Sequence, residues 1–268
     1  SAETSSVPTA TSAAAAIARL AAAGVRVKVI SGDAAPVLLH LVTTLGLPNR
    51  GLLTGTEIAG MTDTALADRA RHADLFARVS PDQKTRIIRA LQSRGHTVGF
   101  LGDGINDAPA IHQADCGLSV DTATDVARAA ADLILLAPDL AVLADGVAEG
   151  RRTYANIMKY VRMGTSSNFG NMLSMAIASV FIPFLPLTPV QVLLNNLLYD
   201  TSETGIPFDD VEPDETARPH GWDMREVLRF TLVMGSLSSV FDLLTFAVLI
   251  WGFDAAPEQF RAAWFLES

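Results

Sequence analysis

Cysteine is nearly absent from this sequence of 268 residues, and acidic residues outnumber basic ones. The single cysteine, Cys116, excludes a disulfide framework and suits a reducing cytoplasm. Lys and Arg number 20 against 29 Asp and Glu, which gives a net charge of −9. Because binding to a phosphate backbone needs a surplus of basic side chains, nucleic acid is not an expected partner.

The sequence also lacks an initiator methionine and a basic segment followed by an apolar core, so we recognise no signal peptide. It ends at residues 264–268, which are typical of the start of another apolar element. We therefore expect both ends to be truncated. A hydrophobic fraction of 49% is high for a wholly soluble protein, so apolar residues must be concentrated in part of the chain.

Through about residue 153 the pattern is that of an α/β unit, in which short apolar runs alternate with helical segments. The expected strands are residues 25–31, 75–79, 97–101, 117–120 and 133–136. Expected helices include 11–23 and 81–94, the second with Ser80 as its N-cap and Pro81 in its first position. This alternation predicts a parallel, doubly wound sheet with its ligands at the carboxyl ends of the strands.

Charged residues are then missing for 37 positions, from 163 to 199 between Arg162 and Asp200. A bilayer core takes about 20 residues per helix, so the gap divides at its prolines into two antiparallel spans, 160–182 and 188–207. A third span is expected over 230–253, where Asp242 is the charged residue. The alternative is a set of buried core helices in a large soluble domain, which the length of the uncharged runs disfavours.

Orientation follows from four basic residues that precede the first span: Arg151, Arg152, Lys159 and Arg162. The positive-inside rule places them in the cytoplasm together with the α/β unit. The acidic linker 208–229 then returns to the cytoplasm. We thus expect a cytoplasmic domain over 1–153 and a transmembrane region over 154–268.

Polar residues follow the first strand and begin a later helix. Ser31, Gly32 and Asp33 place a hydroxyl and a carboxylate at a strand end, although an ordinary turn explains the tripeptide equally well. Lys84 falls in the first turn of the helix from Pro81, where the macrodipole disfavours a cation. An anion held nearby would account for it, and a plain surface lysine is the alternative.

The segment GDGINDAP, residues 102–109, packs two carboxylates and an amide around a glycine turn at the end of a buried strand. Its oxygens suit a hard cation such as Mg²⁺, which usually keeps several waters and takes one or two protein carboxylates.

Together, GDGINDAPA, the upstream SGD and the intervening PDQK resemble the phosphorylation domain of P-type ATPases, within the haloacid-dehalogenase superfamily. The resemblance implies an α/β partial domain that uses ATP as substrate and Mg²⁺ as cofactor. It implies that Asp103 ligates the catalytic Mg²⁺, that Asn106 and Asp107 support phosphate and metal, and that Lys84 contacts the phosphoryl group. Ser31, where the family usually has Thr, would donate a hydroxyl. Asp33 and three glycines complete the implied loops: Gly32, Gly102 and Gly104.

Two expected features of that family are missing. The DKTGT motif with the acceptor aspartate does not occur, nor does the nucleotide-binding domain after it. We therefore expect the chain alone to be inactive and to need the remaining N-terminal part of a pump as its partner. The DPP turn expected near residues 7–9 is also not recognisable.

The membrane half is similar to the fifth and sixth helices of the magnesium-transporting branch, through SSNFGN, FIPFLP and NNLLYD. Asn168 and Asn171 are three residues apart, and Asn196 and Asp200 four apart, so each pair shares a helix face. We expect these four to bind the transported Mg²⁺ in a multi-pass protein of the bacterial inner membrane. For Asp242, structural pairing with Ser236, Ser238 or Ser239 is favoured over transport.

Other functions stay open. A pump for Ca²⁺ or another cation shares the phosphorylation motifs, and a non-catalytic membrane fragment that associates with a full-length pump would explain the missing acceptor aspartate. A soluble phosphatase of the same superfamily is disfavoured by the uncharged stretch. An in-frame DKTGT upstream in the DNA would separate a truncated pump from a fragment.

Overall fold

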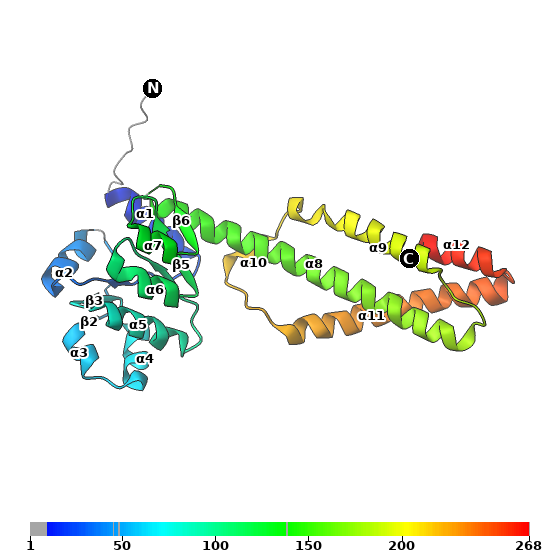
Figure 1. Cartoon of the computed structure of the whole chain (residues 1–268), viewed down its shortest axis with the longest axis horizontal. Helices are drawn as coiled ribbons and strands as arrows, with labels where there is room; N and C mark the ends of the chain where they lie inside the picture. Colours follow the sequence, from blue (N-terminus) through cyan, green and yellow to red (C-terminus); the bar gives the residue numbers. More distant parts are fainter. Residues whose placement is uncertain (1–9, 45, 48, 138, 268) are drawn as a thin grey trace, which may run out of the picture. The chain divides into compact units, whose positions relative to one another are not determined.

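The computed structural model describes residues 10–44, 46–47, 49–137 and 139–267, and it divides the chain into two compact units. The units comprise residues 1–148 and 149–268, whereas the sequence pattern places the boundary between 153 and 154. Figure 1 traces both along the chain. The expected DPP position at residues 7–9 lies outside the described residues.

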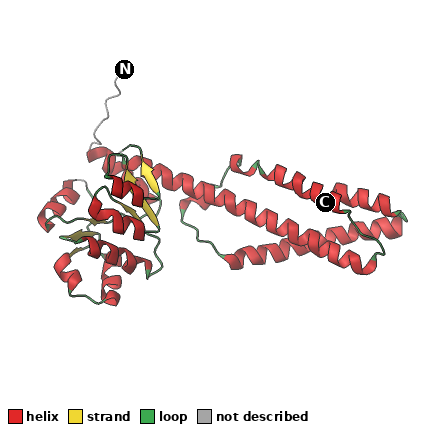
Figure 2. Cartoon of the chain, viewed as in Figure 1, coloured by secondary structure: helices red, strands yellow, loops and turns green. Residues whose placement is uncertain are grey.

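The first unit contains two three-stranded parallel sheets, drawn in yellow in Figure 2. The first sheet has the order β1-β3-β2, from Val29–Ile30, Leu75–Ala77 and Leu52–Thr54. The second has the order β4-β5-β6, from Gly99–Leu101, Cys116–Val120 and Leu133–Leu135. The predicted parallel pairing is confirmed, but the described strands form two separate ladders instead of the expected single sheet. Strand β2 escapes prediction because three residues are too few to show a period of two.

Helices surround these sheets (Figure 1). They are α1 Ala10–Ala22, α2 Ala35–Thr44, α3 Gly55–Ala59, α4 Asp63–His72, α5 Pro81–Gln92, the 3₁₀ turn η1 Ile105–Asp107, α6 Ala108–Gln113 and α7 Asp125–Ala130. The start of α5 is specified by a capping box, because the Ser80 N–H donates to Gln83 Oε1 at 3.0 Å and the Gln83 N–H donates to Ser80 Oγ. This cap determines where Lys84 lies.

A core of fully buried side chains holds the first sheet against α4 and α5. Leu53 on β2 and Phe76 on β3 pack with Leu66 of α4 and Ile87 of α5, all at most 1% exposed. Each such side chain contributes about 1.5–3 kcal/mol by leaving water. The strand ends and the start of α5 are thereby held at one edge of the sheet.

The second unit is helical. The 42-residue helix α8, Leu140–Phe181, begins in the first unit and runs into the second. It is followed by α9 Pro189–Glu203, η2 Ile206–Phe208, α10 Pro213–Ala217, α11 Met224–Ala247, the π turn η3 Val248–Gly252 and α12 Pro257–Glu267.

Among the described residues, one helical segment is long and apolar enough to cross a membrane, the 29 residues Met224–Gly252. This segment includes the expected third span, 230–253, apart from its last residue. The helix in the expected second span, α9, has 15 residues, fewer than the roughly 20 that a bilayer core requires. The first and second spans therefore stay predictions.

Helices α8 and α11 approach closely where both have glycine. A Cβ on Gly235 would lie 2.6 Å from Cδ1 of Phe169 and 2.8 Å from the backbone oxygen of Ser166. The Ser239 hydroxyl adds a hydrogen bond of 2.9 Å to the Gly170 carbonyl. Close backbone approach through small residues, with a hydroxyl bonding across, is a common way for helices to associate in membranes.

Asp242 is buried at 4% exposure and joins three helices. Its carboxylate accepts a short hydrogen bond from the Ser174 hydroxyl on α8 and one of 3.0 Å from Trp264 Nε1 on α12. Structural pairing with a serine is thus seen, but the expected same-helix partners are wrong. Ser239, for example, bonds to backbone carbonyls, as hydroxyls within a helix commonly do.

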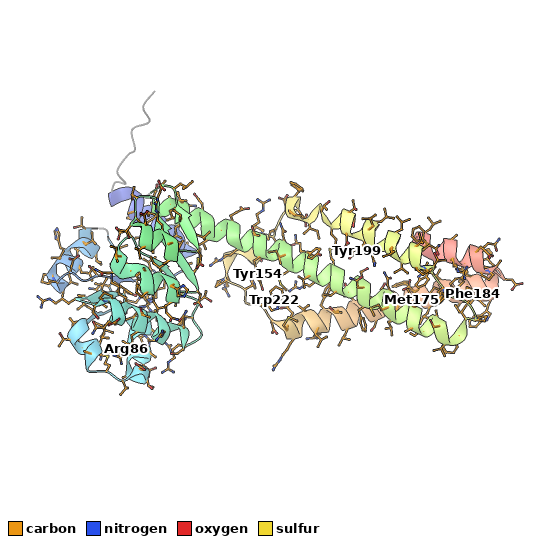
Figure 3. The ribbon with its side chains drawn as sticks, in the orientation of Figure 1. Arg86, Tyr154, Met175, Phe184, Tyr199 and Trp222 are labelled. Atoms are coloured by element: carbon orange, nitrogen blue, oxygen red, sulfur yellow. The ribbon has the colours of Figure 1, made fainter. Side chains whose placement is uncertain are left out.

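Aromatic side chains pack beside this network. Phe260 contacts Phe184 edge-on, with ring centroids 5.5 Å apart, and the ring centroid of Phe246 lies 5.1 Å from that of Phe260. Figure 3 labels Phe184 and Met175 in this region, where the end of α8 meets α12.

The basic residues at the start of the unit bind the linker that follows α9 and the first turn of α11. Lys159 Nζ donates to Asp209 Oδ2 at 2.7 Å, and Arg162 pairs with Glu226 at 2.5 Å. Hydrogen bonding to Lys159 holds the pKa of Asp209 below its usual value. The linker and the basic part of α8 therefore lie at the same end of the second unit.

Candidate functional site

The loop after β1 holds Ser31 and Asp33 together. The Ser31 hydroxyl donates to Asp33 Oδ2 at 2.8 Å and accepts from the Asp33 N–H at 3.1 Å. The Arg78 N–H donates to the Asp33 carbonyl at 2.9 Å, and the Val79 N–H to the Ser31 carbonyl at 3.1 Å. These bonds attach the loop to the segment between β3 and α5.

Helix α5 is joined to the loop after β4 by an ion pair. Lys84 Nζ lies 2.5 Å from Asp107 Oδ1, and the two side chains are only 14% and 13% exposed. The anion that the position of Lys84 suggested is thus supplied, at least in part, by Asp107. The carboxylate offsets the unfavourable position of a cation at a helix N-terminus.

The glycine turn before Asp107 allows this packing. A Cβ on Gly102 would lie 2.6 Å from Asp107 Cβ, so this position requires glycine. The Gly104 N–H donates to Asp107 Oδ2 at 3.3 Å, and the buried Ser119 hydroxyl donates to the Gly102 carbonyl at 2.8 Å. A Cβ at Gly104 or Gly32 would meet only ordinary contacts, at 3.5 Å or more.

Asp103 and Asn106 are exposed on the same loop. The Asp103 backbone oxygen accepts from the Thr124 N–H at 3.1 Å, while its carboxylate makes no hydrogen bond or ion pair with any residue that the structure describes. The described parts of the chain contain no cluster of three or more His, Cys, Asp or Glu side chains. This donor set fits a Mg²⁺ that takes one or two carboxylates and keeps its waters.

Comparison with curated proteins decides the family. The chain is 47% identical over 251 residues, 92% of its length, to the magnesium-transporting ATPase, P-type 1, of Escherichia coli (strain K12) and of Salmonella typhimurium. This chain belongs to the P-type ATPases. It spans 28% of the length of those relatives. The calcium-transporting ATPase 1 of Bacillus cereus is 37% identical over 72% of this chain, and the match covers 22% of the length of that relative.

Two family models match different parts of this P-type ATPase chain. Haloacid dehalogenase-like hydrolase matches residues 2–115, and cation transporting ATPase, C-terminus, matches 184–268. Among solved structures, the catalytic domain of the CPx-ATPase CopB-B aligns with a TM-score of 0.39 at 24% identity, covering 52% of this chain and 44% of that one. The resemblance and the α/β haloacid-dehalogenase-like fold inferred from GDGINDAPA are confirmed.

The four predicted ion ligands of the membrane half are not joined by hydrogen bonds. Asn168 on α8 is exposed, as are Asn196 and Asp200 on α9, and Asn171 is half-buried. Among the residues that the structure describes, no hydrogen bond or ion pair connects these four side chains with one another. The ion site made by them stays a prediction.

Instead, α9 turns a different face toward α8. Glu203 is only 6% exposed, and Tyr199 is half-buried. A Cβ on Gly164 of α8 would lie 3.5 Å from Glu203 Oε1. The sequence reasoning missed Glu203, although an acidic residue at the end of an expected span, four residues after a tyrosine, was a usable signal.

Proposed function

We propose that this chain is part of an ATP-driven magnesium transporter, which couples formation and hydrolysis of an aspartyl phosphate to movement of Mg²⁺ across a membrane. The observation that carries the proposal is the 47% identity, over 92% of the chain, to proteins named as magnesium-transporting ATPases. Residues 1–153 would belong to the phosphorylation domain and 154–268 to the transmembrane region.

In the phosphorylation domain, Asp103 would hold the catalytic Mg²⁺, with Asn106 and Asp107 beside it. When bound, the metal neutralises charge on the phosphoryl oxygens of ATP or of the aspartyl phosphate. The exposed, unpaired carboxylate of Asp103 supports this role. Gly102 lets the turn pack tightly against Asp107, and Gly104 donates its N–H to that carboxylate.

Lys84 and Ser31 would act on the phosphoryl group itself. The ion pair with Asp107 holds the Lys84 ammonium beside the loop of residues 102–107. A phosphoryl group that enters there would compete with the Asp107 carboxylate for this positive charge. The Ser31 hydroxyl is oriented by Asp33, and the N–H groups near Gly32 lie at the same strand end. The protein's part in the reaction is therefore positioning and charge neutralisation.

In the membrane region, Asn168, Asn171, Asn196 and Asp200 would contribute ligands for the transported Mg²⁺, with lipid around the helices. The basic residues of α8 that precede the uncharged run support a cytoplasmic location for that end by the positive-inside rule. The protein would be a multi-pass component of a bacterial inner membrane.

The proposal is tested in a chimera in which this sequence replaces the matching part of the Escherichia coli relative. We expect radioactive magnesium uptake into vesicles to depend on ATP and to be abolished by Asp200→Asn, while phosphorylation from inorganic phosphate survives. The exposed linker substitution Asp210→Asn is the matched control and should leave uptake unchanged. Uptake of calcium in place of magnesium would favour the alternative suggested by the calcium-transporting relatives.

This chain by itself should bind Mg²⁺ and phosphate weakly but form no phosphoenzyme, because it contains no DKTGT acceptor motif. The measurement is incubation with radiolabelled ATP and Mg²⁺, followed by acid precipitation. In the chimera, acid-stable and hydroxylamine-labile label should appear and should be lost in Asp103→Ala. Stoichiometric label on the isolated chain would contradict the assigned mechanism.

A further inference from the structure

Aromatic residues are concentrated in the second unit. The chain has 12 Phe, three Trp and three Tyr, and of these only Phe76 and Phe100 precede residue 149. Neither of the two is exposed. The second unit, in contrast, exposes Trp222 at 55%, Trp251 at 85% and Phe208 at 87%. Large apolar side chains that gather on one part of a surface mark an interaction with something other than water.

Two of these exposed aromatics lie at the two ends of the membrane-length segment Met224–Gly252. Trp222 comes two residues before the segment, and Trp251 is its penultimate residue, followed closely by the exposed Phe253. At about 1.5 Å per residue, the 29 residues rise about 43 Å. A bilayer with both of its headgroup layers is roughly 40–45 Å thick. The two tryptophans are therefore spaced like the two interfaces of a membrane.

The surface between the two tryptophans is apolar. From residue 230 to 253 the one charged side chain is that of Asp242, and it is buried. Six apolar side chains of this stretch are between 46% and 59% exposed: Leu232, Val233, Leu237, Phe241, Leu244 and Val248. An apolar surface of membrane length with a tryptophan at each end is typical of a helix that faces lipid, because the indole combines an apolar ring with a polar N–H.

The hydrogen bonds of the indoles separate Trp222 from the buried Trp264. Trp264 Nε1 donates to the Asp242 carboxylate at 3.0 Å, which is a strong acceptor. Trp222 Nε1 donates to Met224 Sδ at 2.7 Å, and a thioether is a weak acceptor. The water and the lipid oxygens of a membrane interface offer an exposed indole stronger acceptors.

The linker that carries Phe208 and Trp222 is held against α8. Lys159 Nζ donates to Asp209 Oδ2 at 2.7 Å, directly after Phe208, and Arg151 donates to the Thr216 carbonyl at 3.1 Å. These bonds fix the linker at several points and neutralise part of its acidic charge. The exposed aromatics are therefore carried by a segment with a defined position beside the helix.

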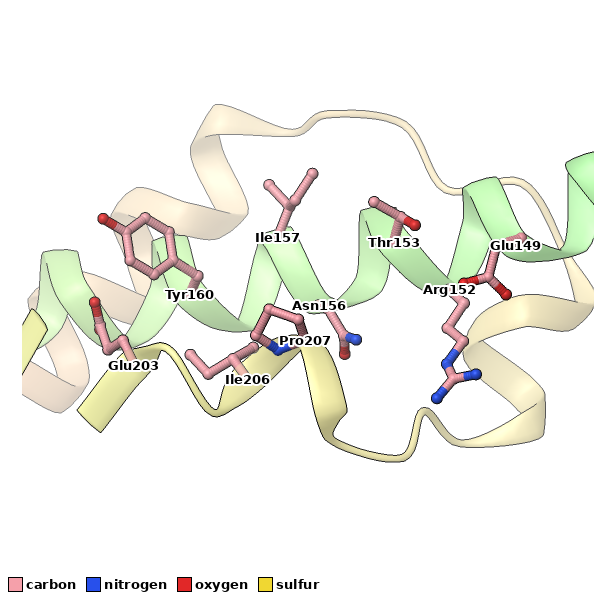
Figure 4. A pocket seen from close by; sticks show the side chains of 9 residues that line it. All are labelled: Glu149, Arg152, Thr153, Asn156, Ile157, Tyr160, Glu203, Ile206 and Pro207. Carbon is pink, nitrogen blue, oxygen red and sulfur yellow. The ribbon is translucent and has the colours of Figure 1, made fainter. Parts of the chain in front are cut away.

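The turn η2 places Phe208 on the outside. Ile206 and Pro207 line a cavity of about 420 Å³ beside α8, together with Ile157 and Tyr160 (Figure 4). Phe208, the last residue of η2, is not part of this lining. The two residues before it thus face α8, whereas its own ring faces the surroundings.

We propose that Phe208 and Trp222 anchor the linker 208–229 in the headgroup region of one leaflet, and that Trp251 and Phe253 lie in the headgroup region of the other. The partner of this surface is a lipid bilayer. The inference rests on the membrane location of the second unit in the proposed function. It adds that the linker lies on the membrane surface, instead of in water or against another part of a pump.

The test is quenching of tryptophan fluorescence in the full chain, reconstituted in vesicles of phosphatidylcholine and phosphatidylglycerol. Trp251→Phe leaves Trp222 and the fully buried Trp264, and adding Trp222→Phe leaves Trp264 alone. The difference between these two variants is the signal of Trp222. We expect lipid brominated near the glycerol end of its chains to quench this signal about twofold more than lipid brominated near the chain ends.

Further positions calibrate the depth. Trp251, measured in Trp222→Phe, should show the same preference for lipid brominated near the glycerol. Phe208→Trp, placed in the background that retains only Trp264, should do so as well. His96→Trp in that background is the matched control, because His96 is an exposed residue of the first unit. It should be quenched by iodide in the water and not by brominated lipid.

Two results would overturn the anchor: quenching of Trp222 by iodide as strongly as in the His96→Trp control, or shielding of Trp222 from both iodide and lipid. An interfacial profile of Trp251 in either case would retain the membrane span without the anchor.

The chimera supplies the second measurement. With p-benzoylphenylalanine in place of Trp222, illumination should cross-link the chimera to phospholipid, and a cross-link to another part of the protein would overturn the inference. Cross-linking to lipid in a chimera that transports no magnesium would retain the anchor and reject the proposed function. Magnesium transport with no cross-link to lipid would retain the transporter and reject the anchor.

Discussion

Substitution of Gly235 by alanine tests the close approach of α8 and α11. The new Cβ would lie 2.6 Å from Cδ1 of Phe169 and 2.8 Å from the Ser166 backbone oxygen. The phenyl ring can rotate away, but the backbone oxygen moves only if the two helices separate. The contact of Ser239 with Gly170 would then lengthen as well.

The magnitude follows from two opposing terms. Overpacking of this kind costs about 1–3 kcal/mol. Replacing glycine by alanine within a helix gains up to about 1 kcal/mol. We therefore expect Gly235→Ala to lower the free energy of unfolding by about 0–2 kcal/mol. Gly150 on α8 is exposed and has nothing within 4 Å of an added Cβ, so Gly150→Ala should raise stability by up to about 1 kcal/mol.

The assay is unfolding of the chain in mixed micelles by increasing SDS, followed by circular dichroism and by fluorescence of the buried Trp264. The two alanine substitutions should shift the transition in opposite directions. A Gly235→Ala variant that is stabilised as much as Gly150→Ala would refute the packing of α8 against α11.

Three further results are expected. A double-mutant cycle of Lys84→Met and Asp107→Asn should give a coupling of about 1–3 kcal/mol in thermal unfolding, since the pair is mostly buried; additive effects would contradict the ion pair. Asp242→Ala should destabilise the chain by about 2–4 kcal/mol in the SDS assay, and Asp242→Asn by less, because the amide oxygen still accepts from Trp264. Burial lowers the pKa of Lys28 to about 8. The unfolded chain then binds more protons between pH about 8 and about 10.4, so stability measured relative to Lys28→Met should rise with pH across that window; a flat difference would contradict the lowered pKa.

Much of the first unit could be predicted from the sequence because its signals are local. Ser80, Pro81 and Gln83 determine the start of α5 within one turn, and the predicted and observed first residues agree. The parallel strands with polar residues at their carboxyl ends, and the motif around Asp103, were recognisable for the same reason. Strand β2 was missed because it is too short to have a pattern.

Partners distant in sequence were decided only by the tertiary structure. Lys84 and Asp107 are 23 residues apart, and Ser174 and Asp242 are 68 apart, so no local rule connects them. The sequence marked Asp200 and Asp242 as costly charges in apolar surroundings but did not indicate what each would face. Glu203 is buried and Asp200 is exposed although they are three residues apart on α9. Periodicity places residues on a helix face, and only the packing of α9 against α8 determines which face is covered, because burial depends on the neighbouring helix.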